Sequence, residues 1–299
     1  EKNPDDVEAT LMLAEHYLVV KDGPKALLVL SGLPEVAGKY PAVLRLRGMA
    51  QLLAGQNASA VHTLQQLAKR APEAIDSHFQ LARAYIASGS VPKAVESLEN
   101  ATVLDPAYRH VEAWLTLVEL QLHAKAFPRA LQITEALNKQ HPRLAAAYEL
   151  AAAAQQGIDN LPAAITAYEQ AVALEPNSPR IKVLVQAYLR NKQPDKATEL
   201  LERWLDQKPR DLPRAMRLGL TYLQSNQLDN AKWIYESVLK ASPANLMAMN
   251  NLAWIYLSLD DPRATELGRK AYESAPNQKE VADTYGWILL QTGNPMRAF

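Results

Sequence analysis

The sequence predicts an all-α protein made of stacked helical hairpins, and three observations support this fold class. Alanine and proline each recur along the 299 residues at a spacing close to 34. Between them, apolar residues recur at the i, i+3 and i+4 spacing of amphipathic helices. The chain contains no cysteine, so disulfides and thiolate metal sites are excluded as sources of stability. Internal repetition at this period is typical of a solenoid, in which stacked units share one elongated core.

An alanine column defines the repeat. Its members are Ala26, Ala60, Ala94, Ala130, Ala164, Ala197, Ala231, Ala264 and Ala298. A proline follows twelve residues after seven of them, at Pro72, Pro106, Pro142, Pro176, Pro209, Pro243 and Pro276. Proline cannot continue a helix, so it marks the end of each unit. We expect the alanines to lie where two helices cross closely, because a larger side chain there would overpack the crossing.

Residues 75–108 show what one period contains. Two apolar stripes at helical spacing lie within it, first Leu81, Ala82 and Tyr85, then Ala94, Leu98 and Ala101. The run Ser88-Gly89-Ser90 separates the stripes, and Asp105-Pro106 closes the unit. Each period therefore predicts two helices joined by a short turn.

This pattern resembles the tetratricopeptide repeat, a helix-turn-helix unit of 34 residues. The small residue of its first helix falls on Ala14, Gly48, Ala82, Ala152, Gly219, Ala253 and Gly286. The aromatic residue one turn later falls on Tyr17, Tyr85, Tyr188, Tyr222 and Tyr256. The resemblance implies a right-handed superhelical solenoid of antiparallel helix pairs, with the first helices lining a concave groove that binds ligands.

Counting along the period gives the repeat limits within one solenoid over residues 1–299. We expect eight complete repeats and a truncated ninth, at 7–40, 41–74, 75–108, 111–144, 145–177, 178–211, 212–245, 246–278 and 279–299. Residues 1–6 are expected to be the end of a preceding repeat, with Pro4 in the terminating place. The chain starts without methionine and stops within an apolar pattern, so we expect it to be a segment of a longer protein.

Composition and motifs argue against several classes of function. The 32 basic and 32 acidic residues give no net charge, which disfavours nucleic-acid binding. No apolar run approaches the roughly 18 residues of a membrane helix, so no membrane contact is expected from this segment. None of the common phosphate-loop, dinucleotide, zinc-protease or serine-hydrolase motifs occurs, and no two of the six histidines stand at i and i+4. We therefore expect no enzymatic activity, cofactor or metal.

The remaining candidates are groove positions on the first helices. By their place in the repeat they are Arg45, Phe79, Arg83, Lys182, Gln186, Arg190, Asn250, Asn251, Trp254, Asp283 and Trp287. Trp254 and Trp287 occupy the same place in consecutive repeats, so they should stand side by side near the two asparagines. Such a pair suits an extended peptide or a stacked sugar ring, although both indoles could instead pack as core between repeats. Arg45 and Arg83 could form a basic groove segment or be ordinary solvated charges.

A second, narrower resemblance covers the C-terminal end. The segments 250–256, 261–264 and 283–290 are similar to bacterial repeat lipoproteins of exopolysaccharide systems, above all those associated with exosortase and PEP-CTERM protein sorting. This resemblance implies a periplasmic or cell-envelope location and a role in polymer export or surface-protein sorting.

The leading hypothesis for function is a non-enzymatic scaffold that binds a protein or peptide segment in the concave groove. The alternatives are a module that guides a carbohydrate and the regulatory arm of a larger enzyme. The sequence leaves the oligomeric state open.

Overall fold

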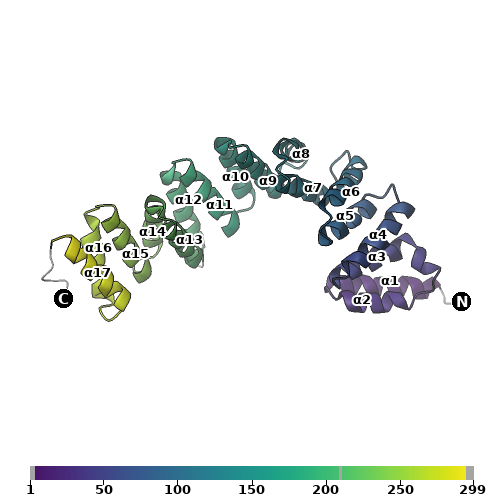
Figure 1. The fold of residues 1–299 in the computed structure, drawn as a ribbon, viewed down its shortest axis with the longest axis horizontal. Coiled ribbons are helices and arrows are strands. Elements are labelled where there is room, and N and C mark those ends of the chain that lie inside the picture. The colour runs from purple at the N-terminus through teal and green to yellow at the C-terminus, as the bar shows by residue number, and fades with distance from the viewer. Residues whose placement is uncertain (1–3, 209–210, 294–299) are drawn as a thin grey trace. The chain divides into compact units, whose positions relative to one another are not determined.

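The computed structural model describes residues 4–208 and 211–293, and all regular structure within them is helical (Figure 1). The predicted all-α class is therefore confirmed. The chain forms two compact units, residues 1–158 and 159–299. Within each unit, helices that follow one another in sequence pack together as hairpins.

The 1–158 unit contains nine α-helices and one 3-10 helix among its described residues. They are α1 (Pro4–Val19), α2 (Gly23–Ser31), η1 (Ala37–Lys39), α3 (Pro41–Leu53), α4 (Asn57–Arg70), α5 (Ile75–Ala87), α6 (Val91–Val103), α7 (Val111–His123), α8 (Phe127–Gln140) and α9 (Ala145–Gly157). Leu64, Leu98, Leu117 and Leu137 form the fully or almost fully buried centre of its main core. This core runs from one hairpin into the next, as expected for a stack of units that cannot bury both faces alone.

The 159–299 unit contains eight α-helices among its described residues. They are α10 (Leu161–Leu174), α11 (Ser178–Arg190), α12 (Pro194–Gln207), α13 (Leu212–Gln224), α14 (Leu228–Ala241), α15 (Leu246–Ser258), α16 (Arg263–Ser274) and α17 (Lys279–Gln291). Tyr235, Leu252 and Ile255 are among its most deeply buried side chains. Helix α14 packs against α13 and α15, and α15 packs against α16.

A left-handed backbone residue follows every second α-helix of the described residues, from α1 to α17. These residues are Lys21, Gly55, Gly89, Lys125, Asp159, Lys192, Asn226, Asp260 and Gly293, with φ between 54° and 79°. In seven of these turns the N–H of the next residue donates to a carbonyl five residues earlier, as from Gln56 to Gln51 at 2.8 Å. This pattern belongs to the Schellman motif, which satisfies the free carbonyls at a helix end. The turn therefore recurs with the period of the repeat even where glycine is absent.

The alanine column lies at close helix crossings. Its eight described members are buried, with at most 2% of the side chain exposed, and Ala298 lies outside the described residues. The small residues of the first helices are equally confined, because a Cβ on Gly48 would lie 2.4 Å from Leu64 Cγ. On Gly219 it would lie 2.9 Å from Tyr235 Cζ. Small side chains at these places allow the two helices of a hairpin to approach each other.

The start of α1 and the connection between α6 and α7 both differ from the predicted repeat. Helix α1 begins at Pro4, where the sequence predicts the end of a preceding repeat; proline suits the first turn of a helix, whose N–H groups have no helical partner. The two extra residues between α6 and α7 are held by the buried carboxylate of Asp105. It accepts hydrogen bonds from the N–H of Arg109 and His110 and from the Trp114 indole, at 2.7 to 3.1 Å.

Candidate functional site

The two tryptophans singled out in the sequence line one hollow of about 470 Å³ in the 159–299 unit. Trp254 lies on α15 and Trp287 on α17, and 40% and 52% of their side chains are exposed. Both indoles are partly exposed in the structure. The other lining residues are Leu257, Ser258, Asp260, Asp261, Pro262, Ala264, Thr265, Gln291 and Thr292. We name this site the tryptophan hollow.

The two asparagines before Trp254 have different environments. The Asn251 amide donates to the buried Tyr235 hydroxyl at 2.9 Å and so connects α15 to α14. The Asn250 side-chain oxygen is buried and has no hydrogen-bond partner among the described residues. Asp283, one turn before Trp287, is exposed.

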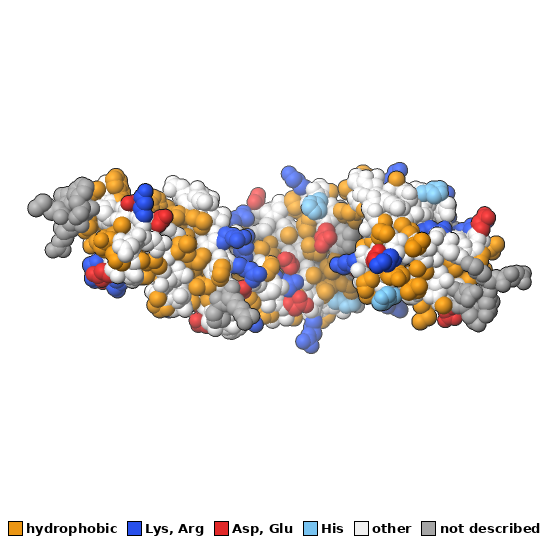
Figure 2. All heavy atoms as spheres, turned by 90° about the horizontal axis from the view of Figure 1, so that it is seen from below, with side chains coloured by type: hydrophobic (Ala, Val, Ile, Leu, Met, Phe, Trp, Pro, Cys, Tyr) orange, Lys and Arg blue, Asp and Glu red, His pale blue; other side chains and the backbone are white. Residues whose placement is uncertain are grey.

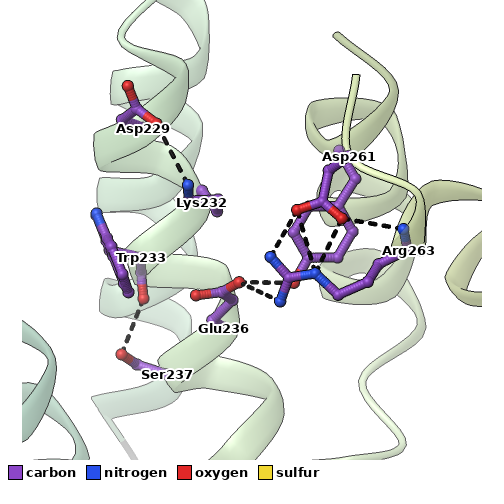
Figure 3. Close-up of polar contacts among 8 residues, drawn as sticks. Asp229, Lys232, Trp233, Glu236, Ser237, Asp261 and Arg263 are labelled. Carbon is purple, nitrogen blue, oxygen red and sulfur yellow. Dashed lines mark hydrogen bonds and ion pairs between the residues drawn. The ribbon is translucent and has the colours of Figure 1, made fainter. Parts of the chain in front are cut away.

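A polar network connects the start of α16 to α14 and α15 (Figure 3). The Tyr256 hydroxyl donates to Glu236 at 2.6 Å, and Arg263 donates to the same Glu236 oxygen at 3.1 Å. Arg263 also donates hydrogen bonds from its Nε and Nη2 atoms to the Asp261 carboxylate at 2.6 to 3.1 Å. Its guanidinium lies 4.1 Å from the centre of the Tyr256 ring. These contacts join α14, α15 and α16, and Asp261 is the one member of the network that also lines the tryptophan hollow.

The same network changes the pKa of two of its side chains. Hydrogen bonds from Arg263 lower the pKa of Asp261 to about 2, because they stabilise the charged carboxylate. Burial raises the pKa of the Tyr256 hydroxyl, and its hydrogen bond to Glu236 adds to that shift. At neutral pH the polar network therefore contains an ionised Asp261 and a neutral Tyr256.

A tyrosine–cation contact of this type recurs along the chain. The pairs are Tyr17 with Lys25, Tyr85 with Lys93, Tyr188 with Lys196 and Tyr256 with Arg263, at 4.1 to 5.8 Å from ring centre to charge. In each pair the tyrosine lies on the first helix of a hairpin and the cation at the start of the second. These aromatic positions of the repeat therefore connect the two helices of each hairpin.

The three groove candidates of the 1–158 unit do not form an open basic site. Phe79 is only 2% exposed and packs against the His110 ring at 4.8 Å, so its predicted place in the groove is wrong. Arg45 lies within 2.9 Å of Glu15 and 4.0 Å of Asp76, which neutralise it from the neighbouring first helices. Arg83 is exposed, donates to Gln80 and lies over the Phe79 ring.

The candidates on α11 lie on the surface of the 159–299 unit. Lys182 and Arg190 are exposed and Gln186 is half-buried. Lys182 lines a hollow between α11, α12 and α13, and Trp204, Arg214 and Arg217 line the same hollow. No sequence motif pointed to these last three residues.

The described residues contain no cluster of three or more histidine, aspartate or glutamate side chains able to hold a metal ion. Among the helices of the same residues, none has the length and apolar character needed to span a membrane.

Stacked helical hairpins with a left-handed turn after each first helix define a helical repeat protein. Two models of the tetratricopeptide repeat match the chain, one at residues 51–107 and 158–218 and the other at 216–279. Together they cover more than half of the chain, which belongs to the tetratricopeptide repeat family. A comparison with curated proteins gave no match.

Solved structures of helical repeat proteins resemble between 54% and 95% of this chain. The C-terminal part of a TPR repeat-containing protein from Cytophaga hutchinsonii is 13% identical, with a TM-score of 0.58 over 92% of this chain and 98% of that chain. A tetratricopeptide repeat protein from Parabacteroides merdae is 14% identical, with a TM-score of 0.54 over 95% and 99%. MamA from Desulfovibrio magneticus RS-1 is 24% identical, with a TM-score of 0.49 over 54% and 90%.

Proposed function

We propose that this chain is a non-enzymatic interaction scaffold that binds an extended peptide segment of a partner protein at the tryptophan hollow. Membership of the tetratricopeptide repeat family supports the general role, since these repeats are protein-interaction modules. The exposure of Trp254 and Trp287 around one hollow is the observation that carries the specific site.

Exposed tryptophans stabilise the fold little, whereas burial of each indole by a ligand removes a large apolar surface from water. The indoles provide apolar contact, and the surrounding side chains provide hydrogen bonds. Ser258, Asp260, Thr265 and Gln291 line the same hollow and can pair with the backbone of an extended segment. Asp261, which also lines the hollow, is held by Arg263 at the start of α16.

The proposal extends to a setting in the bacterial periplasm or envelope. Its support is the similarity of segments 250–256, 261–264 and 283–290 to repeat lipoproteins of exopolysaccharide and PEP-CTERM sorting systems. Trp254 and Trp287 of the tryptophan hollow lie in these segments, so its ligand would be a component of polymer export or surface-protein sorting.

A carbohydrate is the second candidate ligand. Exposed indoles can stack on sugar rings and can also bind apolar side chains. The hydroxyl groups of Ser258 and Thr265 and the amide group of Gln291 could form hydrogen bonds with sugar hydroxyls.

A peptide-display selection tests the proposal. Peptides are selected on the wild-type chain, and their affinities are then measured for the double variant Trp254→Ala/Trp287→Ala. Tyr40→Ala is the matched control, because it removes an exposed aromatic ring in the 1–158 unit. We expect the selected peptides to lose at least about tenfold in affinity with the double variant and nothing with the control. Equal binding to all three proteins would contradict the site, and saturable binding of oligosaccharides without peptide binding would favour the second candidate.

A further inference from the structure

A second hollow, of about 400 Å³, lies between α11, α12 and α13 of the 159–299 unit. Its floor is apolar and consists mainly of Ile181, Val185, Leu201, Trp204 and Leu218. These side chains belong to the packing layer between consecutive hairpins, which is filled in a regular solenoid. The hollow is therefore an opening in the core that reaches the surface.

A small residue at one repeat position contributes to the opening. Ala215 lines it and stands four residues before the small residue of its helix, Gly219. Five other repeats hold a large side chain at the equivalent place, namely Leu44, Trp114, Tyr148, Ile181 and Met249. Because alanine ends at Cβ, α13 has no side chain there to fill the space beside α11 and α12.

The mouth of this hollow is basic. Three cations line it, Lys182 from α11 and Arg214 and Arg217 from α13, and Figure 2 shows basic side chains gathered left of centre, on the 159–299 part of the chain. The one lining carboxylate, Asp211, is buried and is bonded to Ser178 and the Trp204 indole at 2.6 Å and to Arg214.

The Ser178 hydroxyl, with Trp204 and Arg214, holds the pKa of Asp211 below its ordinary value, so this carboxylate stays charged and offsets Arg214. Lys182 and Arg217 are exposed and have no ion-pair partner among the described residues. Two uncompensated positive charges therefore stand on different walls of an apolar hollow.

We propose that this basic-rimmed hollow binds an acidic segment of a partner protein, which inserts one large apolar side chain between carboxylates on either side. The volume is within the range of ligand pockets, and the apolar floor matches a single inserted side chain. A segment with acidic residues on both sides of that side chain meets Lys182 and Arg217 together. A ligand with one carboxylate at its end would meet only one wall. This site is separate from the tryptophan hollow on α15 and α17 and does not depend on its function.

The probe is a pentapeptide in which one phenylalanine is flanked by two glutamates on each side, acetylated and amidated so that no terminal charge contributes. Binding is followed by the fluorescence change of Trp204, in a chain whose four other tryptophans are replaced by phenylalanine. Saturable binding that weakens with added salt is expected, because surface charge pairs are screened. The peptides with glutamine for glutamate or alanine for phenylalanine should each bind at least about tenfold more weakly.

Two variants of the chain test the hollow independently. Ala215→Met fills the opening with the residue type found at the equivalent Met249, so it should weaken the probe at least about tenfold and raise the melting temperature. Lys182→Glu/Arg217→Glu leaves the floor intact and should weaken the probe at least as much. Lys139→Glu, an exposed lysine of the 1–158 unit, is the charge control and should bind as wild type. The melting temperature of each variant verifies that it folds.

The proposal is wrong if the probe shows no saturable binding up to about 5 mM, or if Ala215→Met binds it as tightly as wild type. Tighter binding of dodecanoate than of the peptide would show that the occupant is an acyl carboxylate, which also overturns the assignment to an acidic protein segment.

Discussion

The close crossing of α3 and α4 predicts that Gly48→Ala destabilises the 1–158 unit. The added Cβ would lie 2.4 Å from Leu64 Cγ and 2.5 Å from its Cδ2, and Leu64 is fully buried. Alanine in place of glycine favours a helix by about 1 kcal/mol. Overpacking a filled core costs about 1–3 kcal/mol. Because the clash involves the branch point of a confined side chain, we expect the upper part of that range and a net loss of about 1–2 kcal/mol.

Thermal and urea unfolding followed by circular dichroism measure this loss. Gly38→Ala is the control, because a Cβ there would lie 3.6 Å from the Arg47 guanidinium, an ordinary contact. A double-mutant cycle with Leu64→Ala isolates the clash: the leucine substitution should cost at least about 1 kcal/mol less in the Gly48→Ala background than in wild type. A Gly48→Ala protein as stable as wild type, or additive costs in the cycle, would refute the steric explanation of the small-residue positions.

Three further predictions concern the turns, the polar network at Arg263 and the alanine column. Lys192 has a φ of 54°, so Lys192→Gly should stabilise the chain by about 0.5–1 kcal/mol in urea unfolding. Gly89→Ala should destabilise the chain by about 1 kcal/mol, because Gly89 also has a positive φ. Changes of the opposite sign would contradict the turn assignment. Asp261 has a pKa of about 2 when folded, below the ordinary value near 3.9, so its stabilising effect is present at neutral pH and lost as the pH falls from about 4 through 2. Melting temperatures at pH 2 to 5 should therefore change less in Asp261→Asn than in wild type, and identical profiles would argue against the Arg263 pairing. Ala94→Leu should cost about 1–3 kcal/mol because Ala94 is fully buried, whereas an unchanged melting curve would contradict the alignment of the repeat.

The features predicted correctly from the sequence are those imposed by a steric rule in every unit. The burial of the alanine column follows from helix crossings that admit no larger side chain. The hairpin turn after Tyr85 was visible because Gly89 marks it. The same turn at Lys21, Lys125 and Lys192 was not visible, since a lysine gives no signal of a left-handed backbone.

The candidate site was predicted less completely, because its properties depend on contacts between repeats. Phe79 stands at a groove position, but the longer α6–α7 connection places the His110 ring against it and buries it. Arg45 is neutralised by carboxylates 30 and 31 residues away in sequence, Glu15 and Asp76. The hollow at Ala215 was missed because alanine there looks like another small residue of the repeat. A column-by-column comparison of residue sizes could have found it.

Peptide binding at the tryptophan hollow can be tested by the indole N–H signals of the five tryptophans in a ¹H–¹⁵N spectrum of the full chain. Trp114 and Trp204 donate to Asp105 and Asp211, whereas Trp254 and Trp287 are exposed at the tryptophan hollow. A peptide selected on the wild-type chain should shift the signals of Trp254 and Trp287 and leave that of Trp114 in place. If such a peptide binds with both exposed indole signals unmoved, the tryptophan hollow is not the binding site.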